Sequence, residues 1–224
     1  MNGSSDIVQP SPAHPTGAVT TSTAALTRYY RWHARLYDAT RWSFLFGRAE
    51  LIRAIAGHHS PSNLLEVGCG TGTNLSRLGN QFPKAALTGL DLSEDMLTRA
   101  RRKTSRRDIS VTLLQGCYDR PLGSEPAFDL IVFSYCLSMI NPGWEQALDA
   151  ALRDLRPGGL LGVVDFHDTR LAGFQRWMAF NHVRMEGHLL PHLNACCHPV
   201  VQTLRTAYGG GWRYFLFIGR KQEQ

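Results

Sequence analysis

Apolar and polar positions along residues 62–221 follow two alternating patterns. Short apolar runs bounded by polar residues predict seven strands, at 63–67, 86–91, 110–114, 128–134, 160–165, 200–207 and 212–219. Helical spacing between these runs predicts helices over 73–81, 93–103 and 144–155. Ser93 is the expected N-cap of the second helix, because Glu94 and Asp95 follow it in the first turn.

This alternation of strands and helices is typical of an α/β fold. We expect a Rossmann-like, doubly wound sheet of seven strands, mostly parallel and covered by helices on both faces. Only Gly209-Gly210-Gly211 joins the last two strands, so they are expected to form an antiparallel hairpin. A single domain is predicted over residues 24–224. Residues 1–23 are rich in Pro, Ser and Thr and predict a disordered tail.

Composition narrows the class of protein. The 224 residues are 43% hydrophobic, which is typical of a globular domain. Five scattered cysteines, an odd number, indicate a reducing compartment rather than a disulfide framework. No apolar run reaches the roughly 18 residues of a membrane span, and residues 1–23 lack the pattern of a signal peptide. The net charge of +6 suits an anionic partner, either nucleic acid or a membrane surface.

The strongest motif follows the first predicted strand. Residues 64–72 read Leu-Leu-Glu-Val-Gly-Cys-Gly-Thr-Gly, with glycines at 68, 70 and 72. A dinucleotide fingerprint would need a glycine at the position of Thr73. Asp91 ends the second strand, 19 residues after Gly72, where a carboxylate can accept hydrogen bonds from ribose hydroxyls. A glycine-rich turn that binds nothing is the alternative reading of the loop alone.

The glycine motif and three later segments resemble the class I S-adenosylmethionine (SAM)-dependent methyltransferases. The later segments are 91–97, 128–134 and 155–159. The resemblance implies SAM as the cofactor. It implies that the cofactor is held by Glu66, Gly68, Cys69, Gly70, Thr71, Gly72, Asn74, Asp91, Leu92, Met96 and Ser134. Residues 115–117 are Gln-Gly-Cys, where the family often has an acid that faces the adenine amine.

Two further segments bear on the acceptor. Residues 28–46 contain seven aromatic residues interleaved with four arginines. They predict either an aromatic lid within 24–58 that surrounds an amine, or a helix that packs on the sheet edge. Residues 166–199 hold five histidines and predict a lid that faces substrate and membrane. A zinc site is not predicted there, because Pro191 separates His188 from His192 and no Cys-x-x-Cys pair is present.

Segments 37–42, 187–194 and 209–215 resemble the methyltransferases of betaine-lipid synthesis. The resemblance implies successive N-methylation of the homoserine amine of diacylglyceryl-homoserine, and a partner enzyme that makes this precursor. The catalytic candidates are Tyr30, Tyr37, Tyr135, Asp165 and His167. The substrate-binding candidates are Arg41, Trp42, Trp177, His188 and His192. The predicted location is cytoplasmic, at the inner face of an anionic membrane.

Other readings remain open at this point. The same fold serves methyltransferases of phosphatidylethanolamine or quinones. The positive charge also suits an RNA methyltransferase, although the Asn/Asp-Pro-Pro-Tyr motif is absent and Ser-Tyr-Cys-Leu stands at 134–137. A protein that binds SAM without catalysis is a third reading. Six basic residues within 99–107 are either a membrane footprint or a solvated helix end.

Overall fold

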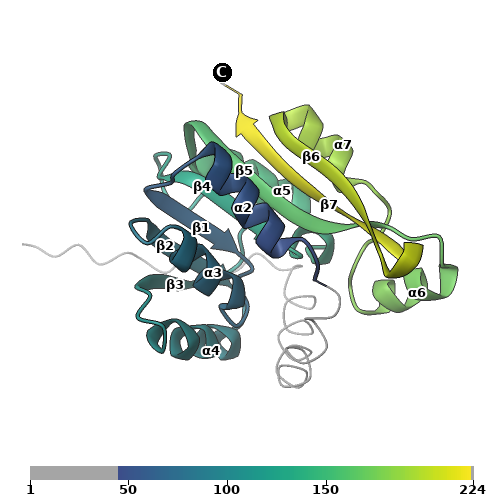
Figure 1. Ribbon diagram of the computed structural model, residues 1–224, viewed down its shortest axis with the longest axis horizontal. Helices are drawn as coiled ribbons and strands as arrows, with labels where there is room; N and C mark the ends of the chain where they lie inside the picture. Colours follow the sequence, from purple (N-terminus) through teal and green to yellow (C-terminus); the bar gives the residue numbers. More distant parts are fainter. Residues whose placement is uncertain (1–44, 223–224) are drawn as a thin grey trace, which may run out of the picture.

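The computed structural model describes residues 45–222, which contain one seven-stranded sheet (Figure 1). Its strands are β1 (Asn63–Val67), β2 (Ala86–Asp91), β3 (Val111–Gln115), β4 (Phe128–Ser134), β5 (Leu155–Asp168), β6 (Cys197–Ala207) and β7 (Trp212–Lys221). They lie in the order β3-β2-β1-β4-β5-β7-β6. The first five strands are parallel, whereas β7 runs antiparallel to β5 and to β6. The predicted fold class and the antiparallel final pair are confirmed.

Helices connect the strands and cover the sheet. They are α2 (Arg48–His58), α3 (Thr73–Gln81), α4 (Glu94–Ser105), α5 (Trp144–Asp154), α6 (Ala172–Phe180) and α7 (Leu189–Cys196), with short 3-10 turns η1 (Leu137–Met139) and η2 (Tyr208–Gly210). Figure 1 shows α2 crossing the sheet over its central strands. Within the described residues, no helix combines the length and apolar character that crossing a bilayer requires.

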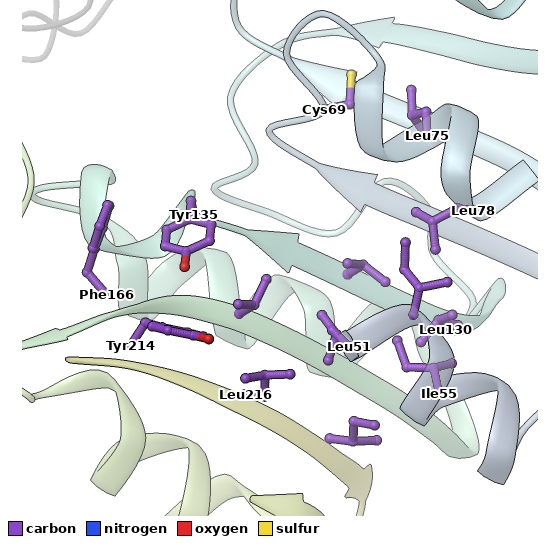
Figure 2. Close-up of a cluster of buried hydrophobic side chains, with 14 of the residues drawn as sticks. Leu51, Ile55, Cys69, Leu75, Leu78, Leu130, Tyr135, Phe166, Tyr214 and Leu216 are labelled. Atoms are coloured by element: carbon purple, nitrogen blue, oxygen red, sulfur yellow. The ribbon is translucent and has the colours of Figure 1, made fainter. Parts of the chain in front are cut away.

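The sheet is buried on both faces. Along β7, Tyr214, Leu216 and Ile218 join one hydrophobic cluster, whereas Phe215 and Phe217 join another. The first cluster includes Leu51 and Ile55 of α2, which Figure 2 shows near Leu130 and Leu216. The second includes side chains of α5 and α7. Successive residues of a strand point to opposite faces, so an almost continuous apolar run fills both layers.

The strand β5 starts earlier than its sequence predicts. Helix α5 ends at Asp154, and Leu155 is already extended and pairs with Phe128. The register then shifts, and regular pairing resumes between Leu130 and Leu160. The end of β7 holds the irregular stretch, because Lys221 Nζ donates to the Leu155 carbonyl (2.7 Å). This contact joins residues far apart in sequence, which local periodicity does not report.

Strand β6 and helix α4 also exceed their predicted bounds. Strand β6 begins at Cys197 rather than at residue 200 and contains Pro199. Because β6 is an edge strand, a residue without an N–H group is tolerated there. Helix α4 runs from Glu94 to Ser105, and the Met96 N–H donates to Ser93 Oγ (3.4 Å), as expected of the predicted N-cap.

Candidate active site

The glycine loop between β1 and α3 lies at the carboxyl edge of the sheet. Gly68, Gly70 and Gly72 have φ values of 67°, 54° and 74°, a region that favours glycine. A Cβ on Gly68 would lie 2.4 Å from Cys136 Sγ, so a side chain is excluded there. A Cβ on Gly70 would meet nothing within 4 Å. The loop therefore packs tightly against the protein at one glycine and leaves open space beside another.

Asp91 holds this loop to the end of β2. The Gly70 N–H donates to Asp91 Oδ2 (2.8 Å), and the Ser93 N–H donates to Asp91 Oδ1 (2.9 Å). The Gly116 N–H, after β3, donates to the Asp91 carbonyl (3.1 Å). A carboxylate oxygen can accept more than one hydrogen bond, so Asp91 can fix the loop and still receive a ribose hydroxyl.

Glu66 and Asn74 form a buried polar pair beneath the loop. Asn74 Nδ2 donates to Glu66 Oε1 (2.9 Å), and both residues are buried. Burial raises the pKa of Glu66 from 4.5 to about 7, although the Asn74 hydrogen bond opposes the shift. Glu66 Oε2 and Asn74 Oδ1 have no hydrogen-bond partner within the described part of the chain. Two unpaired acceptors beside an open glycine loop fit a ligand that carries an ammonium group.

Lys103 is a site residue that the sequence analysis missed. Its Nζ donates to Thr73 Oγ1 (2.6 Å) and Thr71 Oγ1 (3.2 Å), so α4 is tied to the glycine loop. In the sequence, Lys103 belongs to the basic run over 99–107. No local pattern marks its contact with the loop, because the fold brings α4 there, with Ala100 only 2.9 Å from a Cβ on Gly72.

The other cofactor candidates lie around the same loop. The Leu92 carbonyl accepts a hydrogen bond from Gln115 Nε2 (3.4 Å), and Met96 is buried in α4. The Cys69 thiol is also buried, and burial raises its pKa. Ser134 ends β4, and its buried hydroxyl has no hydrogen-bond partner among residues 45–222. The predicted cofactor residues thus converge on the ends of β1, β2 and β4.

Asp165 organises the turn after β4. Its side chain is fully buried, and Oδ2 accepts hydrogen bonds from the N–H groups of Cys136 (3.2 Å) and Ser138 (3.1 Å). Oδ1 accepts from the Phe166 N–H (2.8 Å). Burial raises the pKa of Asp165, and the hydrogen bonds oppose that shift. This geometry gives Asp165 a positioning role, and its predicted role as a proton acceptor gains no support from these contacts.

Tyr135 lies on the side of the sheet that α2 covers. It adopts a left-handed φ of 55°, and its hydroxyl donates to the Phe46 carbonyl (2.9 Å). Its ring meets Phe166 edge-on at 4.7 Å, a contact that Figure 2 also shows. Arg48 lies over the same ring, 5.8 Å from its centre. Tyr135 is therefore buried, and its hydroxyl is engaged by the backbone that leads into α2.

Two predicted histidines lie together on the opposite side of the sheet. A Cβ on Gly187 would approach the His167 ring to 3.2 Å, and His188 follows directly. Burial lowers the pKa of both imidazoles, which favours their neutral forms. His167 Nδ1 and both ring nitrogens of His188 have no hydrogen-bond partner in residues 45–222. Two neutral imidazoles with available nitrogens can accept a proton or a donor group.

Trp144 and an ion pair fix the surroundings of these histidines. His188 and His192 both meet the Trp144 ring edge-on, at 5.1 and 4.9 Å between ring centres. Asp168 ends β5 and binds Arg213 of β7 through two hydrogen bonds, one of 2.6 Å from Nε. Neither Asp168 nor Arg213 is among the predicted site residues. It fixes the end of β5 to β7, next to His167.

Trp177 belongs to an aromatic array on the side that α2 and α6 share. Its ring lies 5.8 Å from Phe174, and Phe174 stacks on Trp212 at 5.0 Å. Tyr208 contacts Trp212 at 4.9 Å and Phe46 at 5.5 Å. The structure therefore separates Trp177 and Tyr135 from the two histidines. Tyr30, Tyr37, Arg41 and Trp42 lie outside the described residues.

Comparison with known proteins shows which class of protein this chain resembles. Residues 64–159 match a family described as a methyltransferase domain. The chain is 30% identical over 139 residues to the malonyl-[acyl-carrier protein] O-methyltransferase of Priestia megaterium, a match covering 61% of this chain and 49% of that protein. It is 30% identical over 117 residues to the demethylmenaquinone methyltransferase of Listeria monocytogenes, covering 51% and 49%. The chain spans about half the length of these relatives.

The structural comparison is more extensive. The N-methyltransferase NodS from Bradyrhizobium japonicum WM9, solved with S-adenosyl-L-homocysteine, aligns with a TM-score of 0.72 and 22% identity. The alignment covers 88% of this chain and 98% of NodS. The fold is that of the class I SAM-dependent methyltransferases. Residues 64–159, which lie within this fold, are the part that matches the methyltransferase-domain family, and SAM is the cofactor that these comparisons support.

In the described residues, no three His, Cys, Asp or Glu side chains gather closely enough to hold a metal ion. His188 and His192 contact Trp144 instead.

Proposed function

We propose that this chain is a SAM-dependent N-methyltransferase that methylates the homoserine amine of diacylglyceryl-homoserine, successively, to give the trimethylated betaine lipid. The observation that carries the proposal is the glycine loop. Gly70 borders open space, and the buried acceptors of Glu66 and Asn74 lack partners among the described residues. These features fit the amino acid end of SAM, and Asp91 fits its ribose.

When bound, SAM supplies a methyl group on a sulfonium, and the sulfur leaves as a neutral thioether. Glu66, Asn74 and Asp91 would hold SAM, and the acceptor nitrogen would take the methyl group through its lone pair as the carbon–sulfur bond breaks. The protein must align the amine and exclude water. It must also remove one proton from each ammonium before transfer, because a protonated amine has no lone pair.

His167 and His188 are the described groups best suited to accept that proton. His167 lies near the end of β5 and His188 in the segment after it, and their lowered pKa values favour the neutral imidazoles. Gly187 has a φ of 71°, and a Cβ there would press on the His167 ring. The glycine of the 187–194 segment, one of the segments that resemble betaine-lipid methyltransferases, therefore leaves room for the His167 ring directly before His188.

A lipid acceptor places the enzyme at the inner face of an anionic membrane, as the sequence predicts. An alternative acceptor of the same general kind is a lipid quinone, because demethylmenaquinone methyltransferases are among the relatives of this chain. Phosphatidylethanolamine is another alternative. All three alternatives would use the same cofactor loop of this chain. They differ only in the lipid that is methylated.

Mass spectrometry of lipids tests the proposal. The chain is expressed in a host with or without the diacylglyceryl-homoserine precursor. We expect a gain of one to three methyl groups on that lipid, only when the precursor is present. The matched control is Asp91→Ala, which removes the carboxylate that holds Gly70 and should abolish the gain. Methylated phosphatidylethanolamine or quinone in place of the betaine lipid would refute the proposed acceptor and retain methyl transfer.

A further inference from the structure

Helix α6 turns an apolar face to solvent. The exposed fractions are 54% for Leu171, 52% for Trp177 and 81% for Phe180. Met178 is the one buried residue of α6, and Phe174 is partly buried against the same cluster. Phe180 comes two residues after Met178, which places it about 200° around the helix. The apolar residues of α6 therefore lie on both its inner and its outer face.

The exposed face continues onto the tip of the β6–β7 hairpin. Tyr208 in η2 is 61% exposed, and its ring contacts Trp212. Trp212 stacks on Phe174 of α6, which in turn contacts Trp177. These ring contacts join Trp177 and Tyr208, while Leu171 at the N-cap and Phe180 at the last position of α6 are exposed at its two ends. We call these four exposed residues the α6 face: Leu171, Trp177, Phe180 and Tyr208. A gathering of exposed large apolar side chains of this kind indicates an interaction site.

Along the α6 segment, the formal charges of the described residues are of one sign. Residues 170–182 contain Arg170, Arg176 and His182 and no acidic residue. The nearest acids along the chain are neutralised, because Asp168 pairs with Arg213 and Glu186 pairs with Arg184. Neither Arg170 nor Arg176 forms an ion pair with any described residue, and both are exposed. The surface therefore combines aromatic side chains with uncompensated positive charge.

The α6 face shares an edge of the sheet with the cofactor loop. Helix α6 follows the carboxyl end of β5, and the glycine loop follows the carboxyl end of β1. The strands β1, β4 and β5 are mutually parallel, so both ends lie at the same edge (Figure 1). A partner bound on the α6 face therefore lies on the side of the molecule where the cofactor site opens.

We infer that the α6 face docks on an anionic lipid bilayer, with Leu171 and Phe180 inserted at the interface. Charge complementarity selects this occupant, because the face carries arginines without acids, and anionic headgroups attract such clusters. Aromatic and leucine side chains on a cationic helix are typical of interfacial binding. The inference rests on the proposed function, because docking would orient the proposed active site toward a lipid headgroup. Bilayer binding itself is measurable without any substrate.

Sedimentation of the full chain with vesicles tests the inference. The vesicles contain phosphatidylcholine alone or mixed with phosphatidylglycerol, and no acceptor lipid. We expect binding only to the mixed vesicles, weakened by salt. The double variant R170Q/R176Q should bind about 30-fold more weakly, since each basic residue near an anionic surface contributes about 1 kcal/mol. The double variant L171S/F180S should bind at least about tenfold more weakly.

The matched control is Leu122→Ser, which alters an exposed leucine after β3 and should leave vesicle binding unchanged. The melting temperatures of all variants are measured to verify folding. They should equal that of the wild type, because the altered side chains are solvent-exposed. Equal binding by the wild type and both double variants would overturn the inference. A dimer of the wild type in sedimentation velocity that L171S/F180S dissociates would overturn it too, since the face would then bind a second copy.

The failure of this inference differs from the failure of the proposed function. Vesicle binding that depends on the α6 face, without methylation of diacylglyceryl-homoserine, would keep the docking surface and refute the acceptor. Methylation of a short-chain, water-soluble analogue without any vesicle binding would keep the acceptor and refute the docking surface.

Discussion

Replacing Glu66 by glutamine should stabilise the protein and weaken its cofactor binding. Glu66 is fully buried and is hydrogen-bonded by Asn74 Nδ2 at 2.9 Å. Glutamine has nearly the same shape and keeps an oxygen to accept that hydrogen bond. The substitution therefore removes the cost of an ionised group in the core and leaves the packing intact.

The size of the effect follows from the pKa of Glu66, which burial raises from 4.5 to about 7. Each unit of pKa shift corresponds to about 1.4 kcal/mol, so the full shift is worth about 3 kcal/mol. The folded state binds the proton more tightly than the unfolded state, so the wild type loses stability as the pH rises from 4.5 to 7. E66Q should gain less than about 1 kcal/mol at pH 5 and about 3 kcal/mol at pH 8.

Urea unfolding of both proteins at pH 5 and pH 8 measures this difference. The control is E125Q, which alters an exposed carboxylate in the loop before β4 and should change stability equally at both pH values. Isothermal titration with SAM gives the second readout. If Glu66 binds the ammonium of the cofactor, E66Q should weaken SAM binding about 10- to 100-fold, the value of a hydrogen bond to a charged group. Destabilisation by E66Q, or a gain that is equal at pH 5 and pH 8, would refute the reasoning.

Four other substitutions test the loop and its supports. Gly72→Ala should destabilise the fold by more than about 2 kcal/mol in urea unfolding, because a Cβ would lie 2.9 Å from Ala100 at a φ of 74°. Gly70→Ala should cost only about 1 to 2 kcal/mol but should weaken SAM binding more, and the reverse ranking would contradict the described loop. Lys103→Met should weaken SAM binding several-fold in titration calorimetry with little change in melting temperature, since it frees the glycine loop from α4. Unchanged affinity would show that the contact of Lys103 with the loop does not support cofactor binding. Asp165→Asn should destabilise by about 3 kcal/mol in thermal unfolding, because an amide nitrogen would face backbone N–H groups that now donate to the carboxylate; a native melting temperature with lost activity would instead favour a catalytic carboxylate.

The cofactor half of the fold was predictable because its signals are local. The bounds of β1, β2 and β4 agree with the sequence analysis to the residue, since buried parallel strands read as continuous apolar runs. The glycine loop required φ values that only glycine adopts readily, so the sequence marks it directly. Asp91 ends β2, which is the parallel neighbour of β1 in the sheet. This pairing brings its carboxylate to the Gly70 N–H.

The part of the fold around β5, β7 and the β4–η1 turn was less predictable because segments distant in sequence build it. Asp168 and Arg213 meet across 45 residues, and Tyr135 reaches the Phe46 carbonyl across 89. Asp165 resembled a free acid at the end of a strand, whereas its contacts come from the backbone of the β4–η1 turn. Such contacts depend on tertiary packing and leave no period in the sequence.

The position of β7 has a consequence for how the chain is assembled. It is the last strand along the sequence, yet it lies inside the sheet, between β5 and β6. Until residues 212–221 have been synthesised, β5 presents an open edge and β6 has no place to pair, and unpaired edges favour aggregation. The sheet cannot be completed progressively from one end. A truncated chain that stops before Trp212 should therefore lack the folded β5-β7-β6 part of the sheet. Tags and fusions at the carboxyl end therefore have to leave Trp212–Lys221 free to insert between its two neighbours.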